Sequence, residues 1–384
     1  MPHFVFKDDS ILAELAKFVA PNSFSLDAVK NIFLEATDNG VFAMATNTMT
    51  GGARVKIPGS RVITPGKLIL PLSTGNTHQA FMKQIVQLKM DDGKNVIHAV
   101  VGDAKFDVPT INTDDFPEFP VEPIDKPTCV LSVDELKKLL SVAEFSSTDK
   151  NQKEEFKGIY IMLGKGKAAS MAINPPGIFA HCKLETKSSI DFDPFEVLLT
   201  QGGTTLLQRH ILTLTGSQEL WLWKPNGHQK RLIVQTPDQS CIFWLAEVQA
   251  SADAFSKLKV AYLGKNENSR SGVVSTKELK SVMENIIALI GSGEKSITQM
   301  TLSSTSQVAY ASELISNGNQ PLPITIEGEP VTFLIDPGLV KKAMDEMDAT
   351  KPSLINISTL NYPVVFEQTM GNMTLRIPIM LKTK

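Results

Sequence analysis

Cysteine is scarce in this chain of 384 residues, and its few copies lie far apart. The three cysteines are Cys129, Cys182 and Cys241, and no two of them have a paired spacing. This pattern argues against a disulfide framework and offers no zinc-binding spacing. We therefore expect a protein of a reducing compartment, the cytoplasm, that holds no metal.

Long apolar runs and a strong net charge are missing as well. No stretch approaches the roughly 18 apolar residues of a membrane span, and the opening MPHFVFKDDS has no apolar signal region. The formal net charge is −3, which is too small to attract nucleic acid or acidic membranes over the whole surface. We expect no membrane partner, and any contact with DNA has to come from a local basic surface.

Catalytic signatures are equally hard to find. The sequence has no P-loop, HExxH or GxSxG string, and its six histidines are scattered. The loose dinucleotide-like string GKGKAA at 164–169 sits between two expected strands, so a hairpin turn is the better interpretation. His181 and Cys182 are neighbours on an expected strand and would point to opposite faces. We expect no catalytic residue and no cofactor.

A helix signature does recur along the chain. SVDELKKLLS at 132–141 returns 143 positions later as STKELKSVME at 275–284, and ELAK at 14–17 lies 121 positions before its first counterpart. Both Ser132 with Glu135 and Ser275 with Glu278 form the S-x-x-E capping box of a helix start. The likeness therefore extends to the residues that begin the helix.

A second landmark keeps the same offsets. FDP at 192–194 recurs as IDP at 335–337, again 143 positions apart, and ILPLS at 69–73 precedes IDFDP by 121. Each Asp-Pro pair offers a cap and a proline suited to the first helical position. Repeats of this period indicate whole domains. We predict three, at 1–124, 125–264 and 265–384, joined by linkers at 114–127 and 263–272.

Between the landmarks the apolar pattern changes to period two. Segments such as GIYIMLGKGKAASMAI are typical of β-hairpins, with turns at 38–40, 164–166 and 225–227. Each repeat then has the order strand, helix, strands, helix, strands. The fold class is α+β, with two helices of each repeat packed on antiparallel sheets. Trp221 and Trp223 could stack on bases from one strand face, but core or interface packing is the favoured interpretation.

At this level of detail the chain resembles the bacterial sliding clamp, the beta subunit of DNA polymerase III. The resemblance covers essentially the whole chain and is carried by GDAKFDVPTINTDDFPEFP at 102–120, EFKGIYIML at 155–163, FLIDPGLVKKAMDEM at 333–347 and LRIPIML at 375–381. It implies three alike domains with curved sheets, and a head-to-tail homodimer that closes a ring around duplex DNA. It also implies a clamp loader that opens the ring, and no catalysis.

The helices offer a test of that implication, because helices that line a pore should turn basic faces to the phosphates. With residues placed at 100° intervals, five of the six expected helices carry lysine roughly opposite the apolar stripe. The expected DNA-contacting residues are Lys17, Lys83, Lys138, Lys277, Lys280, Lys341 and Lys342. The exception is the helix expected after Pro194. Asp134, Glu284 and Asp345 share the basic faces.

The resemblance also implies an apolar cleft for short hydrophobic peptides of polymerases and the loader. Carried over by position, the cleft would use Phe156, Ile178, Phe179, Pro363, Ile377, Pro378, Ile379, Met380 and Leu381. In this family a turn like Ala-Thr-Asp-Gly-His-Arg-Leu forms part of the pocket, whereas this chain has AINPPGIFA at 172–180. The Asp, His and Arg are gone, which leaves the partner preference open. Pro378 lacks a ladder donor and favours a sheet edge or an exit from the sheet.

Two functions of different classes remain after this step. The first is a processivity factor that encircles duplex DNA and tethers the replicative polymerase. The second is a ring or adaptor protein of the same fold that binds other proteins and does not encircle DNA. Reversing the charge of the expected pore lysines separates the two, because only the first function depends on phosphate attraction.

Overall fold

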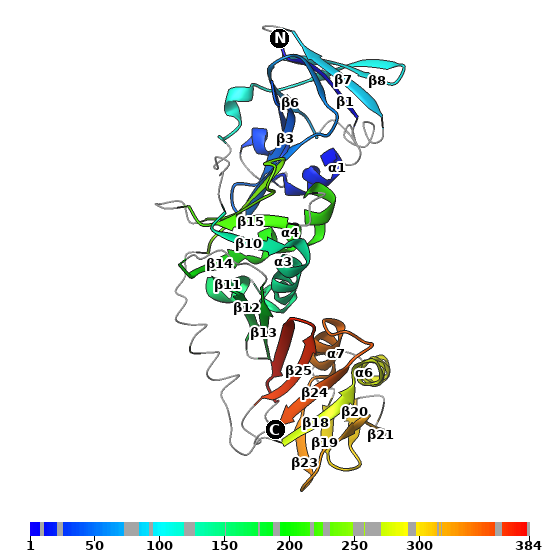
Figure 1. The fold of residues 1–384 in the computed structure, drawn as a ribbon. Helices are drawn as coiled ribbons and strands as arrows, with labels where there is room; N and C mark the ends of the chain where they lie inside the picture. Colours follow the sequence, from blue (N-terminus) through cyan, green and yellow to red (C-terminus); the bar gives the residue numbers. More distant parts are fainter. Residues whose placement is uncertain are drawn as a thin grey trace. The chain divides into compact units, whose positions relative to one another are not determined.

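The computed structural model shown in Figure 1 forms two compact units. Unit 1 comprises Met1–Lys137 and Ser188–Val248, and unit 2 comprises Lys138–Lys187 and Gln249–Lys384. The structure describes residues 1–7, 11–20, 26–72, 84–91, 95–118, 127–149, 151–175, 177–186, 193–215, 219–225, 231–248, 257, 270–290, 297–312, 315, 317–357 and 363–381. Within these ranges no helix is long and apolar enough to cross a membrane.

Unit 1 contains two antiparallel sheets, with strand orders β5-β1-β7-β8-β9 and β10-β15-β16-β17-β4-β3-β2-β6. The strands are β1 His3–Lys7, β2 Ile32–Thr37, β3 Gly40–Thr46, β4 Gly51–Lys56, β5 Arg61–Thr64, β6 Gly66–Leu70, β7 Ile85–Met90, β8 Val96–Val101, β9 Ala104–Pro109, β10 Cys129–Ser132, β15 Glu219–Trp223, β16 Arg231–Gln235 and β17 Cys241–Ala246. A further strand of this unit, β14 Phe195–Thr200, packs beside β16 and β17.

The helices of unit 1 lie against the larger sheet. They are α1 Ile11–Leu15, η1 Ala16–Phe18, η2 Asp27–Lys30, η3 Thr113–Asp115 and α4 Gln201–Thr215, and the unit boundary falls inside α3 Val133–Leu140. Phe18 of η1 and Phe243 of β17 are both buried, with their ring centroids 6.1 Å apart. Apolar packing therefore fixes the short N-terminal helix on the sheet.

Unit 2 is built on a run of antiparallel strands in the order β11-β12-β13-β26-β25-β24-β18-β22, with a second sheet β21-β20-β19-β23. The strands are β11 Gly158–Gly164, β12 Lys167–Asn174, β13 Ile178–Glu185, β18 Arg270–Ser275, β19 Ile297–Leu302, β20 Gln307–Ala311, β21 Gly318–Pro321, β22 Ile324–Thr325, β23 Val331–Leu334, β24 Pro352–Ile357, β25 Val364–Met370 and β26 Met373–Ile379.

Two longer helices pack side by side in unit 2. They are α6 Thr276–Ile290 and α7 Pro337–Asp345, drawn in yellow and orange in Figure 1. The same unit also contains the short η4 Ser141–Phe145 and η5 Glu154–Lys157, which pack against β11 and β12. On α6 the residues at helical spacing, Leu279, Met283 and Ile286, are fully buried. This stripe is the apolar face that the sequence predicts for the helix.

The element order repeats along the chain as predicted. A strand is followed directly by a helix at β1–α1, β10–α3 and β18–α6, and a second helix is followed by three strands at α4–β15–β16–β17 and α7–β24–β25–β26. The second helix expected in the first repeat would involve residues 73–83, which lie outside the described residues, as does Lys83. The α+β fold class is confirmed.

Strands of different predicted repeats share sheets. β17 pairs with β4 in unit 1, and β13 pairs with β26 in unit 2. Each pairing joins a strand from 125–264 to a strand of a neighbouring repeat. The two compact units therefore do not coincide with the predicted repeats. The three domains at 1–124, 125–264 and 265–384 therefore stay a prediction.

The predicted hairpin turns are confirmed at two of the three positions. The 38–40 turn joins β2 to β3, and the 164–166 turn joins β11 to β12. Gly40 and Gly166 have φ values of 119° and 65°, the left-handed region that glycine adopts without a steric cost. The GKGKAA string is therefore a hairpin and not a phosphate loop. Most of the third turn, 226–227, lies outside the described residues.

One expectation that rested on proline is wrong, and another holds in one of its two forms. Pro194 does not begin a helix, because Phe195–Thr200 forms β14 first and α4 starts only at Gln201. A proline just before a strand costs no ladder bond, so the same residue suits either element. Pro378 does not lie on an edge, because β26 runs between β13 and β25, but it does lie at the exit from the sheet, since β26 ends one residue later at Ile379. The pairing of β26 with β13 is interrupted between Ile379 and Arg376, where Pro378 has no N–H to donate.

Candidate functional site

The first predicted DNA-contacting lysine lies on the short helix of unit 1. Lys17 is exposed on η1, and its Nζ donates to Oε1 of Glu14 at 2.9 Å. Its side chain is 46% exposed, so a phosphate could reach the ammonium group. An exposed pair of this kind contributes at most about 1 kcal/mol, so Glu14 competes only weakly for Lys17.

The helix α3 starts as its sequence predicts. The backbone N–H of Ser132 donates to Oε2 of Glu135 at 2.7 Å, and the N–H of Glu135 donates back to Oγ of Ser132 at 3.1 Å. These reciprocal bonds are the capping box. Lys138, on the same helix, donates from Nζ to Oδ1 of Asn372 at 3.4 Å. This lysine therefore holds the β25–β26 turn as well as offering a charge.

The helix α7 begins at the predicted Asp-Pro pair. Oδ1 of Asp336 accepts a hydrogen bond from the N–H of Gly338 at 2.8 Å, and Pro337 occupies the first helical position. At the start of α6 only one arm of the predicted capping box is formed, from the N–H of Glu278 to Oγ of Ser275 at 3.4 Å. A different set of polar contacts fixes that end of α6.

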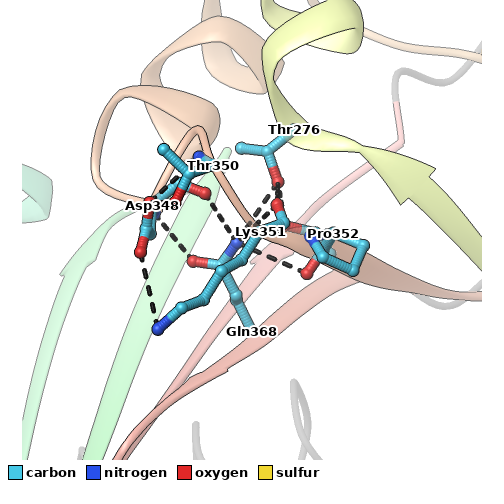
Figure 2. A network of polar contacts seen from close by, with 7 residues as sticks. Thr276, Asp348, Thr350, Lys351, Pro352 and Gln368 are labelled. Atoms are coloured by element: carbon cyan, nitrogen blue, oxygen red, sulfur yellow. Dashed lines mark hydrogen bonds and ion pairs between the residues drawn. The ribbon is translucent and has the colours of Figure 1, made fainter.

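Those contacts form the buried network of Figure 2. Gln368 of β25 is 2% exposed, and its Nε2 lies within hydrogen-bond distance of the carbonyl of Lys351 at 3.1 Å and of Oγ1 of Thr276 at 3.2 Å. Thr276, the first residue of α6, donates in turn to the carbonyl of Lys351 at 2.6 Å. The network attaches the start of α6 to the loop that follows α7, and so fixes the spacing of the two helices.

Four predicted lysines stand on α6 and α7 of unit 2. Lys280 donates to Oδ1 of Asp345 at 2.7 Å, and Lys341 donates to Oδ2 of the same carboxylate at 2.7 Å. A second carboxylate, Glu284, lies 3.7 Å from Lys341. Lys277 is exposed. Lys342 places its Nζ 5.5 Å from the ring centroid of Phe145, within cation–π range.

The surface of these two helices has nearly as many acidic as basic residues. The lysines Lys277, Lys280, Lys341 and Lys342 share it with Glu278, Glu284 and Asp345, and Glu346 directly follows α7. Burial, together with the nearby charges of Glu144 and Asp345, raises the pKa of Glu346 to about 7. Partial burial alone would raise the pKa of Asp345, but hydrogen bonds from Lys280 and Lys341 outweigh it and lower that pKa below its ordinary value.

Most of the predicted peptide-binding residues gather in unit 2 where β13 and β25 begin and β26 ends. Ile178 pairs with Ile379, and the N–H of Met380 donates to the carbonyl of Gly177 at 2.8 Å. Pro363 directly precedes β25, whose first residue Val364 pairs with Ile379 as well. The strand ends thus bring together most of the residues that the resemblance implies.

Their side chains differ in accessibility. Ile178, Phe179, Ile377 and Ile379 are at most 1% exposed, and Pro363 and Pro378 are buried too. Met380 and Leu381 are half-buried, and so is Phe156 on η5, which packs against β11 and β12. Solvent therefore reaches Met380, Leu381 and Phe156, whereas the other predicted cleft residues are buried.

Several contacts at these surfaces were not predicted. Gln368 and Asn372 carried no motif, and the turn glycine Gly177 meets α7, since a Cβ there would lie 3.0 Å from Cδ1 of Leu339. Glu284 and Asp345 were recognised as sharing the lysine faces, but their pairing was not. An acidic residue four positions after a lysine was the available signal for Lys341 and Asp345.

Three of the other candidate residues of the sequence, His181, Cys182 and Trp223, are buried in the fold. His181 and Cys182 lie buried on β13, and burial raises the pKa of the Cys182 thiol to about 12. Trp223 is in a core cluster with Ile233, Ile242 and Trp244, away from solvent. Among the residues that the structure describes, no three His, Cys, Asp or Glu side chains are placed to hold a metal ion.

The chain resembles solved bacterial clamps over its full length. The DNA polymerase sliding clamp of Bacillus subtilis matches with a TM-score of 0.84 and 15% identity, covering 100% of this chain and 99% of the other. The beta subunit from the DNA polymerase of Streptococcus pyogenes matches with a TM-score of 0.84 and 13% identity, covering 100% of both. A Pseudomonas aeruginosa sliding clamp bound to griselimycin matches with a TM-score of 0.82 and 13% identity, again covering 100% of both chains.

These structural matches establish the fold, and the chain has the sliding-clamp fold from end to end. No protein-family model matches the sequence, and no curated protein matches it either. At 13–15% identity, the likeness to these clamps is a likeness of fold.

Proposed function

We propose that this chain, which has the sliding-clamp fold, forms a ring around duplex DNA and tethers a DNA polymerase to its template. The observation that carries the proposal is the full-length likeness to polymerase clamps, with TM-scores of 0.82 to 0.84. A partial likeness could reflect one shared domain, but a ring needs every domain of the chain. The proposed role involves no catalysis, because a closed ring raises processivity by topology.

Ring closure would use two strand edges. In the described part of unit 1, β9 pairs only with β8 and ends its sheet. Among the described strands of unit 2, β18 is followed only by the two-residue β22, and Val273 and its cross-strand neighbour Leu354 are 58% and 41% exposed. Large apolar side chains beside an open edge favour pairing with another chain. A head-to-tail homodimer, with three domains per chain, would cover both edges.

Contact with DNA would be made by lysines on the helices. Lys17 and Lys277 are exposed, and Lys280 and Lys341 keep 36% and 34% of their side chains exposed despite their ion pairs. Attraction between such side chains and phosphates is independent of base sequence, so it permits sliding. Lys83, which lies outside the described residues, belongs to the same proposed set.

Partner peptides would bind at the ends of β13, β26 and β25. Half-buried Met380 and Leu381 offer apolar anchors beside the turn at Gly177. A polymerase or a clamp loader would insert a short hydrophobic segment there, and the buried Ile178 and Ile379 would keep the floor rigid. The altered turn at 172–180 is expected to set which peptide is preferred.

The three acidic residues that accompany four lysines on α6 and α7 favour a second candidate, a ring or adaptor that binds proteins and does not bind DNA. The two functions separate in one experiment. Lys17, Lys83, Lys280, Lys341 and Lys342 are changed together to Glu, and DNA synthesis by the partner polymerase is measured with and without the clamp. A clamp that encircles DNA loses its stimulation, because phosphate attraction turns into repulsion.

The matched control reverses the same number of lysines elsewhere. Lys56, Lys67, Lys89, Lys153 and Lys167 are exposed on strands and loops. Changing these five to Glu alters the net charge equally and should leave stimulation intact, with the assembled mass of both variants unchanged. Unaltered stimulation by the first variant at moderate salt would favour the protein-binding candidate.

A further inference from the structure

One carboxylate forms ion pairs with two of the proposed DNA-contacting lysines at once. Asp345 lies at the last position of α7, and its two oxygens accept hydrogen bonds from Lys280 of α6 and Lys341 of α7, each at 2.7 Å. All three side chains are between 34% and 36% exposed. The bridge is therefore at the surface, within reach of a phosphate.

Helix stability does not account for an acidic residue at this position. The C-terminal end of a helix carries partial negative charge, so a carboxylate there is unfavourable. The order of the intrahelical pair, with Lys341 four residues before Asp345, is also the weaker of the two orientations. Asp345 is thus placed against the local electrostatics of its own helix.

Helix packing does not need the bridge either. Leu279, Met283 and Ile286 of α6 are fully buried, as are Val340 and Ala343 of α7. The buried network around Gln368 fixes the start of α6 to the loop after α7. With apolar packing and a buried network in place, an exposed ion pair adds little to the association of the helices.

We propose that Asp345 is an internal competitor of the DNA phosphates, which occupies Lys280 and Lys341 until a phosphate displaces its oxygens. This inference rests on the proposed function and says how that function is tuned. DNA binding must first break the hydrogen bonds to Asp345, so the two lysines contribute less than free lysines would. The ring then grips DNA weakly and relies on its closure to stay bound.

The variant Asp345→Asn tests the proposal, because it keeps the shape of the side chain and removes its charge. Binding to a short fluorescent DNA duplex is measured across a salt series. Each lysine freed for a phosphate contact steepens the slope of log K against log salt by about 0.9. The expected slope for Asp345→Asn is steeper by about 1 to 2, with binding roughly tenfold tighter near 0.1 M salt.

Two further variants separate this effect from a general change of charge. Glu278→Gln removes one negative charge from the exposed face of α6 at a residue that takes no part in the bridge of Lys280, Asp345 and Lys341, and should leave the slope unchanged. Adding Lys280→Gln and Lys341→Gln to Asp345→Asn should abolish the gain, because the freed lysines are then absent.

The outcomes are distinct. If wild-type protein is retained on circular DNA and Asp345→Asn has the wild-type slope, the inference is overturned and the proposed function stands. An equal gain in Asp345→Asn and Glu278→Gln also overturns it, since general electrostatics then suffices. If neither wild-type protein nor any variant binds DNA, the proposed function fails and the inference fails with it.

Discussion

Asp348 and Gln368 exchange two hydrogen bonds across the loop that follows α7. The backbone N–H of Asp348 donates to Oε1 of Gln368 at 2.7 Å, and Nε2 of Gln368 donates back to the carbonyl of Asp348 at 3.0 Å. One buried amide side chain thus makes the pair of backbone hydrogen bonds that a neighbouring strand would make with this loop. Because the network also includes Thr276, it couples this loop to the start of α6.

The first prediction concerns that amide. Gln368→Ala leaves the N–H of Asp348 and nearby carbonyls without their partner, and each buried unsatisfied group costs about 1–3 kcal/mol. We expect faster hydrogen exchange in α6 and β24, consistent with a loss of about 2–4 kcal/mol of local stability. Gln299→Ala, an exposed glutamine on β19, is the control and should leave exchange unchanged. Equal protection in both variants would show that the network is not stabilising.

The second prediction compares two neighbouring glycines of α4. A Cβ on Gly203 would lie 2.4 Å from the carbonyl oxygen of Thr50, whereas a Cβ on Gly202 would meet nothing closer than 3.5 Å. Gly203→Ala should therefore lower the thermal midpoint, with a cost of about 1–3 kcal/mol. Gly202→Ala should raise it slightly, because alanine favours a helix by about 1 kcal/mol over glycine. The prediction fails if both variants shift the midpoint in the same direction.

The third prediction concerns His98 of β8. Its Nδ1 lies 2.6 Å from Asp107 of β9, and its Nε2 lies 3.1 Å from Asp91 after β7. The hydrogen bond with Asp107, and then that with Asp91, raises the pKa of His98 above its ordinary value. A protonated ring that donates to both carboxylates bridges three neighbouring parts of the sheet.

The sign of the pH dependence follows from that shift. A raised folded-state pKa stabilises the fold fully below the unfolded value near 6.5, and this contribution is lost as pH rises through the folded pKa. NMR titration of His98 should show the raised pKa in the wild-type protein. Asp107→Asn should lower it more than Asp91→Asn, because Asp107 makes the larger contribution. An unchanged titration in Asp107→Asn would contradict the bridge.

The fourth prediction concerns the proposed peptide site. Met380→Ala removes a half-buried anchor beside Gly177 and should weaken a polymerase C-terminal peptide at least tenfold, or about 1.4 kcal/mol. Met370→Ala removes a half-buried methionine at the opposite end of the β25–β26 hairpin and should leave the affinity unchanged. Isothermal titration with one peptide measures both. Equal affinities for wild type and Met380→Ala would place the site elsewhere.

Features set by neighbouring residues could be predicted from the sequence. The capping box of Ser132 and Glu135 and the Asp336 cap both depend on residues within three positions, and both are formed. The turns at Gly40 and Gly166 have the same local origin. Pro194 shows the limit, because a proline is compatible with the start of a strand or of a helix, and only the sheet contacts of β14 decide.

Features that depend on packing could not be predicted. The lysine faces follow from helical spacing, but the bridge between Lys280 and Asp345 requires α6 and α7 to lie side by side. Likewise, the position of Pro378 inside a sheet depends on β13, which comes nearly 200 positions earlier in the chain. The burial of Phe179 and Ile377 depends on the same strand pairing. These two side chains are therefore buried parts of the proposed site and not part of its exposed surface.

The central claim is that the chain holds DNA by encircling it, and retention on circular DNA tests this most directly. The protein is loaded onto a nicked circular plasmid with its clamp loader, separated from free protein by gel filtration, and then treated with an enzyme that linearises the plasmid. The account predicts that the protein stays with the circle through the column and leaves once the DNA has free ends, because no strong contact then holds it. Equal retention on circular and linear DNA, or none on the circle, would contradict it.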